Sequence, residues 1–282
     1  HEGYMYAKYS NLVDFCLMWE NGQQDVDDFD QFKEYIWKYW KEYYFSDERY
    51  ARLDNKAVLT VWSYGNMKTA FGGTEEGVKE AIEFMNQELI EMGYDGLILL
   101  FAVQGEQTQD TYEKYNDLGF AGSYAYHYGP AGNSAEHQIS ANRTNYENSL
   151  GISHHIPTIS IGFNDVARND SRDPVISAED HLKVCEDAKE ILELYNTGTW
   201  KDNTVMISNW NEYSEGTYVF PCEQNGFTYL ENIRHAFTND TSDHSELDVK
   251  PTQNQIDRVT HMYPDNHSNI RWLQFEESDE QK

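Results

Sequence analysis

Apolar runs alternate along the chain with amphipathic helical patterns, and polar stretches separate them. Continuous apolar runs of strand length predict strands at 13–19, 57–64, 96–102, 121–128, 157–163 and 204–210. Apolar residues spaced three and four apart predict helices at 28–44, 74–93, 108–117, 177–195 and 226–237. Because the strand runs are continuous rather than alternating, they indicate a parallel sheet that is covered on both faces.

This alternation predicts an α/β fold, and the residues that follow the strands favour a (β/α)₈ barrel of the TIM type. Polar and aromatic side chains gather directly after the predicted strands, and catalytic groups of such barrels lie at the C-terminal ends of strands. A doubly wound sheet also binds ligands there, but it would usually carry a glycine-rich phosphate loop. Neither GxGxxG nor GxxxxGK[ST] follows a predicted strand. A barrel is therefore expected, with six βα units in this chain in place of eight.

The texture of the sequence changes near Thr238. The segment TNDTSDHSELD is polar, acidic and rich in turn residues, and the chain ends in EESDEQK. We therefore expect a barrel domain over 1–237, followed by an acidic C-terminal tail over 238–282 that is partly docked on the domain.

Charge and hydropathy narrow the class of partner. The chain has 21 Lys and Arg against 49 Asp and Glu, a formal net charge of −28. This excess argues against nucleic acid and against an anionic membrane surface. A mean hydropathy of −0.78, with no long apolar run, argues against a transmembrane helix. Aromatic residues make up 15% of the chain, which argues against a disordered acidic protein.

The cysteines predict neither a zinc ribbon nor a disulfide framework, because Cys16, Cys185 and Cys222 are widely spaced and form no CxxC pair. Cys16 and Cys185 lie in apolar runs, so we expect both thiols to be buried. No metal and no cofactor is expected. His1 opens the chain without a recognisable signal peptide, which indicates a start inside a longer protein.

The strongest candidate for chemistry is the motif ISNWNEYSEGTY at 207–218, at the end of the last predicted strand. Glu212 and Glu215 stand three residues apart, and Gly216 permits a tight turn. Cleavage of a glycosidic bond uses two carboxyl groups, and sugars are held by amides and by flat rings. The motif supplies such groups in Asn209, Trp210, Asn211 and Tyr213. Since acidic chains contain many Glu-x-x-Glu pairs, a capping and turn cluster is the alternative for this spacing.

Further polar and aromatic residues follow the other predicted strands, and we expect them to bind substrate at the same site. They are Trp19, Glu20, Asn21, Trp62, Tyr64, Tyr126, His127, Asn164, Asp165 and Arg168. Each has a structural alternative. Trp62 and Tyr64 are also typical of aromatics at the edge of a core, and Asp165 with Arg168 of an ion pair that staples a loop.

Several of these motifs resemble glycoside hydrolase family 99 and the related group described as WbsX-type glycosyltransferases. NWNEYSEGTY is similar to the family signature NEWxEGT, with Tyr213 where Trp is usual. Other passages resemble the family in the same order: DFCLMWEN, FSDERYARLDNKAVLTVW, SYAYHY, GFNDVAR and GFTYLENIR. The chain departs from the family at Ala57, Asn164 and Asp165. The similarity extends over roughly 12–237.

The resemblance implies a (β/α)₈ barrel of which this chain carries the third to eighth strands, with the first two βα units expected before His1. It also implies a retaining, endo-acting hydrolase of α-linked, mannose-like glycans of the bacterial type. On that model Glu215 is the general acid/base and Glu212 is the base that activates a neighbouring 2-hydroxyl. A hydrolase of this kind is expected outside the cell or at its surface.

Two alternatives remain open at this point. The first is a WbsX-type glycosyltransferase of polysaccharide biosynthesis. A nucleotide-diphosphate donor would require a phosphate cradle or clustered Arg and Lys, which do not appear after the predicted strands. The second is a non-catalytic domain that binds glycans.

Overall fold

The computed structural model describes residues 4, 10–22, 26–128, 133–164, 175–222 and 225–240. The chain divides into two compact units, His1–Thr238 and Asn239–Lys282. All helices and strands given below belong to the first unit. The expected tail over 238–282 lies outside the described residues from 241 onward.

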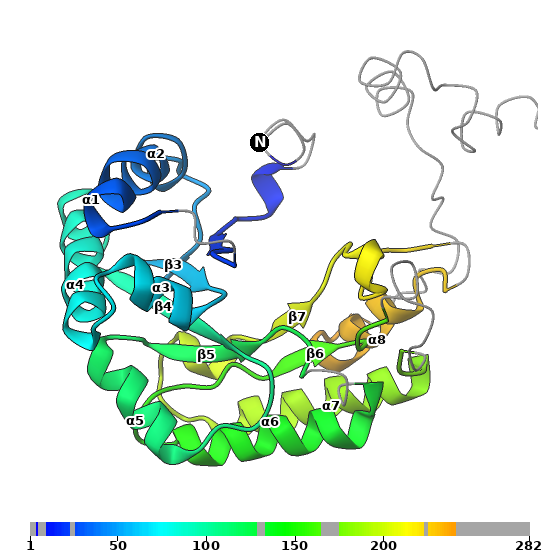
Figure 1. Ribbon diagram of the computed structural model, residues 1–282. Helices are drawn as coiled ribbons and strands as arrows, with labels where there is room; N and C mark the ends of the chain where they lie inside the picture. Colours follow the sequence, from blue (N-terminus) through cyan, green and yellow to red (C-terminus); the bar gives the residue numbers. More distant parts are fainter. Residues whose placement is uncertain are drawn as a thin grey trace, which may run out of the picture. The chain divides into compact units, whose positions relative to one another are not determined.

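Parallel strands form the centre of the first unit (Figure 1). One sheet pairs four of them in parallel and in chain order: β1 (Leu17–Trp19), β3 (Lys56–Val61), β4 (Leu97–Val103) and β5 (Gly122–Ala125). The short β2 (Arg52–Leu53) joins β3 in antiparallel fashion. A second sheet pairs β6 (Thr158–Ser160) with β7 (Met206–Ser208) in parallel. The architecture is a parallel-sheet α/β fold of the (β/α)₈ barrel type, as the sequence predicts.

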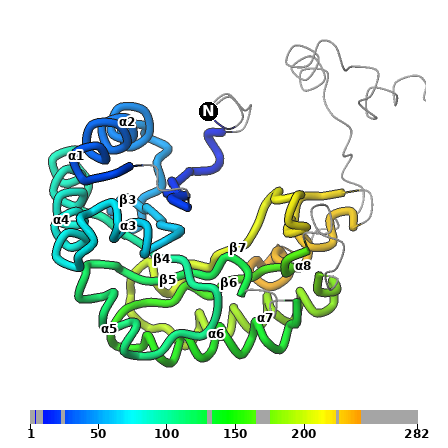
Figure 2. The backbone as a smooth tube through the Cα atoms, in the orientation of Figure 1, coloured from blue at the N-terminus to red at the C-terminus, as the bar shows by residue number. Residues whose placement is uncertain are grey.

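Helices connect the strands, and α4 to α7 follow one another along the outer side of β3 to β6 (Figures 1 and 2). The longer helices are α3 (Tyr64–Ala70), α4 (Glu75–Glu91), α5 (Gln109–Leu118), α6 (Ala135–Ser149), α7 (Ala178–Leu194) and α8 (Thr228–Phe237). A continuous helical segment of α and π turns comprises α1 (Phe29–Gln31), η2 (Phe32–Trp37), α2 (Lys38–Trp40) and η3 (Lys41–Phe45). The 3₁₀ turns whose bounds lie within the described residues include η1 (Ser10–Leu12), η5 (Trp200–Asn203) and η6 (Tyr213–Glu215). No helix in the described ranges is long and apolar enough to cross a membrane.

Helix starts follow the chemistry of their first residues. The hydroxyls of Thr74 and Ser177 accept backbone N–H groups three residues further on and so cap α4 and α7. Ser63, Thr108 and Ser134 cap α3, α5 and α6 in the same way. These caps satisfy N–H groups that have no partner inside the helix, and they fix where each loop after a strand ends.

The core lies on both sides of the central strands β3 and β4, where Leu59 and Leu99 are fully buried. Much of the aromatic content packs between the sheet and the helical segment 29–45. Phe32 lies at the centre of this packing, and its ring contacts those of Trp19, Trp37, Trp40 and Phe71. Many of the aromatic residues of the sequence are therefore part of the hydrophobic core.

Helix α6 has no counterpart in the sequence prediction, because its buried face is polar. Gln138, Asn142 and Asn145 are fully buried on that face. The Asn142 amide donates to the Thr158 carbonyl and accepts the Thr158 N–H, both at 2.9 Å. Gln138 accepts the N–H of Ser160 at 3.2 Å. The side chains of α6 thus bind the backbone of β6. Beside β5, the described residues show an isolated bridge between Ser123 and His155, which precedes β6.

The cysteines differ from the prediction in one case. Cys185 is buried in α7 as expected, but Cys16 is exposed. Cys16 precedes β1, which pairs only with β3 among the described strands. Met18, two residues further along the same face, is also 42% exposed. The strand in the apolar run 13–19 is therefore buried on one face only.

Candidate active site

Three segments that lie far apart in the sequence meet at the C-terminal ends of the strands. Trp62 follows β3, Tyr126 follows β5 and Glu215 lies beyond β7. The Trp62 and Tyr126 rings meet edge to face, with centroids 5.0 Å apart. The Tyr126 hydroxyl donates to Oε2 of Glu215 at 3.2 Å. The structure thus brings together three of the side chains that the sequence singled out.

Both candidate carboxylates lie on a hairpin formed by residues 209–220, directly after β7. Its two arms are joined by backbone bonds from Val219 N to Asn209 O at 2.9 Å and from Phe220 N to Trp210 O at 3.0 Å. The turn η6 closes the hairpin, which begins after a cis peptide between Ser208 and Asn209.

Glu212 and Glu215 therefore project from one short turn. The Ser214 hydroxyl donates to Oε1 of Glu212 at 2.8 Å. A hydroxyl donor thus holds each carboxylate, Ser214 for Glu212 and Tyr126 for Glu215.

A close backbone contact docks this hairpin on the end of β6. The Asn164 N–H donates to the Glu215 carbonyl at 2.7 Å. Gly216 follows in a left-handed conformation with φ of 60°, and a Cβ at this position would lie 2.4 Å from the Asn164 carbonyl oxygen. Only glycine fits both conditions, so the glycine of the motif determines how closely the turn approaches β6.

Electrostatics keep the Tyr126 hydroxyl protonated. Burial is the first cause that raises the pKa of Tyr126, and the neighbouring carboxylates of Glu215 and Glu212 raise it further. Because the phenol stays neutral, it remains a hydrogen-bond donor to Glu215 at any pH at which the protein would work.

Three large rings on the hairpin are open to solvent. Trp210, Tyr213 and Phe220 are 52%, 53% and 40% exposed. Phe220 lies nearly perpendicular to both of the others, with centroids 5.3 Å from Trp210 and 6.2 Å from Tyr213. Phe220 could not be predicted as a site residue from the sequence, because only the hairpin pairing places it beside Trp210. Asn211 is exposed on the same hairpin.

His127 and Asn164 flank the site at the ends of β5 and β6. The His127 ring packs on Phe163, with centroids 4.8 Å apart. The Asn133 amide accepts the Phe163 N–H at 2.6 Å and donates to the Phe163 carbonyl at 2.8 Å, which fixes the residue before Asn164. Two further predicted site residues, Asp165 and Arg168, lie outside the described part of the chain.

Two predicted aromatic residues pack against helices, and one of them lies in the interior. Trp19 is only 4% exposed, and its ring packs against those of Phe32 and Trp40. Tyr64 begins α3, and its ring packs edge-on against Tyr115 of α5 at 4.8 Å. The Trp19 ring belongs to the packing between sheet and helices, so its predicted sugar contact is corrected. Tyr64 is half-buried, and its sugar contact stays a prediction.

The polar residues after β1 also serve local structure. Asn21 is 1% exposed, and its amide accepts the Ser63 N–H and donates to the Ser63 carbonyl, both at 2.8 Å. It therefore joins the ends of β1 and β3 rather than offering its amide to a ligand. Glu20 is exposed and accepts the N–H of Gly22 at 3.0 Å, which closes its own turn.

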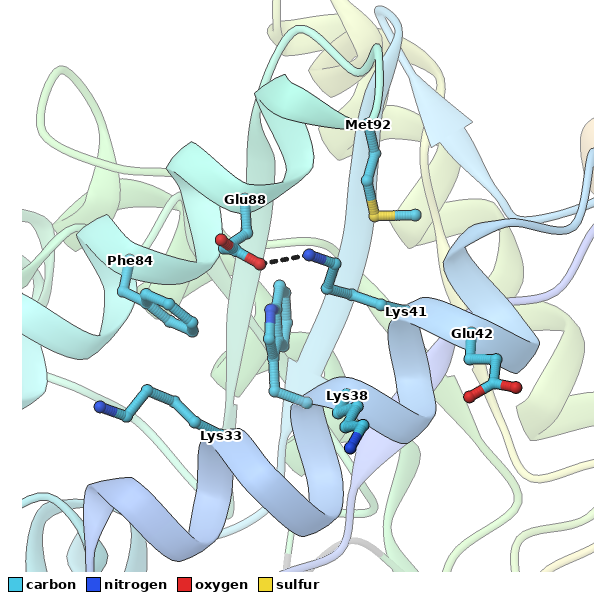
Figure 3. Close-up of a pocket in the computed structure, with 8 residues that line it drawn as sticks. Lys33, Lys38, Lys41, Glu42, Phe84, Glu88 and Met92 are labelled. Atoms are coloured by element: carbon cyan, nitrogen blue, oxygen red, sulfur yellow. Dashed lines mark hydrogen bonds and ion pairs between the residues drawn. The ribbon is translucent and has the colours of Figure 1, made fainter.

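A pocket of about 420 Å³ lies elsewhere, between α4 and the helical segment 29–45. Figure 3 shows Lys41 and Glu88 facing each other across it as an ion pair, with Phe84 and Met92 beside them. None of the predicted site residues lines this pocket. It is a groove of the helical layer and is separate from the site around Glu215.

The described residues contain no group of three or more His, Cys, Asp or Glu side chains that is arranged to hold a metal ion. The adjacent histidines His154 and His155 are fully buried. Burial lowers the pKa of each to about 3, so both are neutral parts of the interior near pH 7.

Comparisons with known proteins agree with this fold. The family model described as Glycosyltransferase WbsX matches residues 5–233. A solved structure described as a glycoside hydrolase-like protein is similar with a TM-score of 0.54 and 16% identity, over 70% of this chain and 58% of that one.

Two structures of the family 99 endo-alpha-mannosidase from Bacteroides thetaiotaomicron have TM-scores of 0.42 and 0.41 and identities of 15% and 17%. Each match includes 71% of this chain and 62% or 58% of the other. The chain thus spans less than two thirds of each of these structures. No curated protein sequence matches it.

Proposed function

The chain belongs to the family described as Glycosyltransferase WbsX. From this premise we propose that it is a glycoside hydrolase of neutral glycans, with Glu212 and Glu215 as its catalytic residues. The observation that carries the proposal is the pair of carboxylates on one hairpin turn, each bound by a hydroxyl donor. Paired carboxyl groups flanking a bond are what glycoside hydrolysis requires. The domain over 1–237 is proposed as the catalytic domain, with 238–282 as its tail.

The proposed mechanism retains the anomeric configuration. Glu212 takes the proton of the sugar 2-hydroxyl, whose oxygen attacks C1 and gives a 1,2-anhydrosugar. In the same step Glu215 gives its proton to the leaving oxygen, and the Tyr126 hydroxyl stabilises the carboxylate that forms. In the second step Glu215 removes a proton from water, the water oxygen attacks C1, and Glu212 returns the proton to O2.

The proposed substrate is an α-linked, mannose-like glycan cut at internal linkages. This choice rests on the similarity of NEYSEG at 211–216 to the family 99 signature. The exposed rings of Trp210 and Tyr213 offer flat surfaces for the apolar faces of sugars next to the carboxylates. The amides of Asn209 and Asn211, with Trp62, His127 and Asn164, are proposed to bind hydroxyl groups and rings of the same chain. A net charge of −28 suits a neutral ligand.

The test is a Glu215→Gln variant assayed for release of reducing ends from a panel of polysaccharides that includes α-mannan. Loss of a general acid lowers kcat by about 10³-fold on unactivated substrates, while binding to the same polysaccharide persists. Glu193→Gln, an exposed glutamate on α7, serves as the matched control and keeps full turnover. Full turnover by Glu215→Gln would contradict the assignment.

The description of the family favours a second candidate, a glycosyltransferase. This reaction would release a nucleoside diphosphate from a sugar nucleotide in the presence of an acceptor glycan. Incubation with a set of sugar nucleotides, followed by measurement of released diphosphate, separates the two. Acceptor-dependent release, without reducing ends from polysaccharides, would establish transfer in place of hydrolysis.

A further inference from the structure

We propose that Tyr128 is a positioning residue, held in a left-handed conformation by Asn142 and His155, and that it fixes the end of β5 so that the Tyr126 hydroxyl reaches Glu215. The inference rests on the proposed function for the role of Glu215. Tyr128 itself is 1% exposed, so it touches no substrate and acts only through Tyr126.

The backbone of Tyr128 is the first observation. Its φ is 56°, which is rare for a bulky residue because Cβ then crowds the following carbonyl oxygen. The other described non-glycine residues with positive φ are Asp54 and Asn55, small polar residues of the turn between β2 and β3. Such a conformation persists where its surroundings overdetermine it, and it is typical of functional sites.

A chain of buried hydrogen bonds supplies that constraint. The Tyr128 hydroxyl donates to Oδ1 of Asn142 and lies 3.2 Å from Nε2 of His155. On the other side of the imidazole, Nδ1 of His155 lies 2.9 Å from the Ser123 hydroxyl. The Ser123 hydroxyl in turn lies 3.1 Å from the Tyr112 hydroxyl.

The donors follow one direction along this chain. Because Tyr128 gives its proton to Asn142, it accepts from His155 Nε2, and Nδ1 then accepts from Ser123. The neutral imidazole is the form that satisfies every group, which agrees with a pKa of His155 lowered to about 3 by burial.

The same asparagine fixes the chain before Tyr126. The Asn142 amide binds both the N–H and the carbonyl of Thr158, and the Thr158 hydroxyl accepts the Ala125 N–H at 2.9 Å. Tyr126 therefore lies between Tyr128, which binds Asn142 directly, and Ala125, which is linked to Asn142 through Thr158. Its own carbonyl accepts a hydrogen bond from the Ser208 hydroxyl at the end of β7.

The experiment compares Tyr128→Phe with Tyr94→Phe in the full chain. Both variants lose the hydroxyl of a buried tyrosine, but the Tyr94 hydroxyl donates to the Phe45 carbonyl and takes no part in the hydrogen-bond chain of Tyr128. Tyr128→Phe is expected to lower kcat on the polysaccharide about tenfold with KM changed less than twofold, because the misplaced donor no longer stabilises Glu215. Tyr94→Phe keeps kcat, although its melting temperature falls similarly. Equal effects of the two variants on kcat would overturn the proposal.

A crystal structure of Tyr128→Phe gives a readout that does not depend on turnover. The expected result is a distance above 3.5 Å between the Tyr126 hydroxyl and Oε2 of Glu215, against 3.2 Å in the parent chain. An unchanged distance would refute the positioning role even if the protein is an active hydrolase. A lengthened distance in a protein that hydrolyses none of the glycans would keep the positioning role and reject the hydrolase.

Discussion

The buried imidazole of His154 makes the unfolding free energy depend on pH. One substitution at this position should remove that contribution. The ring is fully buried between Tyr195 and Trp200, with centroids at 4.4 and 5.1 Å, and neither ring nitrogen has a hydrogen-bond partner among the described residues. His154→Phe keeps an aromatic ring in this place and removes the titrating group.

The magnitude follows from proton linkage. Burial first, and then the charge of Lys201 and the neighbouring His155, lower the pKa of His154 from 6.5 to about 3, and Asp202 opposes this weakly. Between these values the unfolded chain binds the proton and the folded chain does not, so stability is fully present above pH 6.5 and is lost as the pH falls. From pH 7 to pH 5 this one group removes about 2 kcal/mol of unfolding free energy.

The assay is urea unfolding followed by tryptophan fluorescence at pH 7 and pH 5. His154→Phe should lose about 2 kcal/mol less than the parent chain over this interval, while strain from the larger ring cancels because it is the same at both pH values. His235→Gln, at an exposed position of α8, is the control and should follow the parent. An equal loss in His154→Phe and in the parent chain would refute the reasoning.

Two further predictions concern packing and access. Gly216→Ala should lower the unfolding free energy by about 1–3 kcal/mol more than Gly198→Ala, because both residues have positive φ but only a Cβ at 216 meets Asn164. Urea unfolding of the two variants measures this difference. Equal losses of unfolding free energy would contradict the prediction. Native labelling with a maleimide should modify Cys16 and spare Cys185, whose pKa burial raises to about 12, until urea unfolds the chain; mass spectrometry of tryptic peptides shows which thiol reacts.

Periodicity predicted the strands and most helices because their buried faces are apolar. Helix α6 escaped this reasoning, since its inward positions hold Gln138, Asn142 and Asn145 in place of aliphatic residues. These amides bind the Thr158 and Ser160 backbone and the segment before α5, where Asn145 accepts the Gln107 N–H at 2.8 Å. A search for periodic apolar residues therefore misses a helix whose inward side chains are polar and bind the backbone of a neighbouring strand.

The sequence predicted correctly that several side chains after the strands meet, but it did not predict which of them pack in the interior. Trp62, Tyr126 and Glu215 come together as three strand ends converge. Trp19 follows the same sequence pattern, but the aromatic helix of residues 29–45 covers it. Whether a ring at a strand end faces the barrel mouth or the helical layer depends on the position of that helix, which local sequence does not specify.

The backbone bond from Asn164 to Glu215 also gives the hairpin a spectroscopic signature. The Asn164 amide hydrogen is bound only while the turn is docked on β6, so its exchange with deuterated solvent measures how often the turn departs. Exchange at this single amide thus reports the population of assembled sites in the absence of any sugar. A bound glycan that holds the hairpin in place would slow the exchange in proportion to its occupancy.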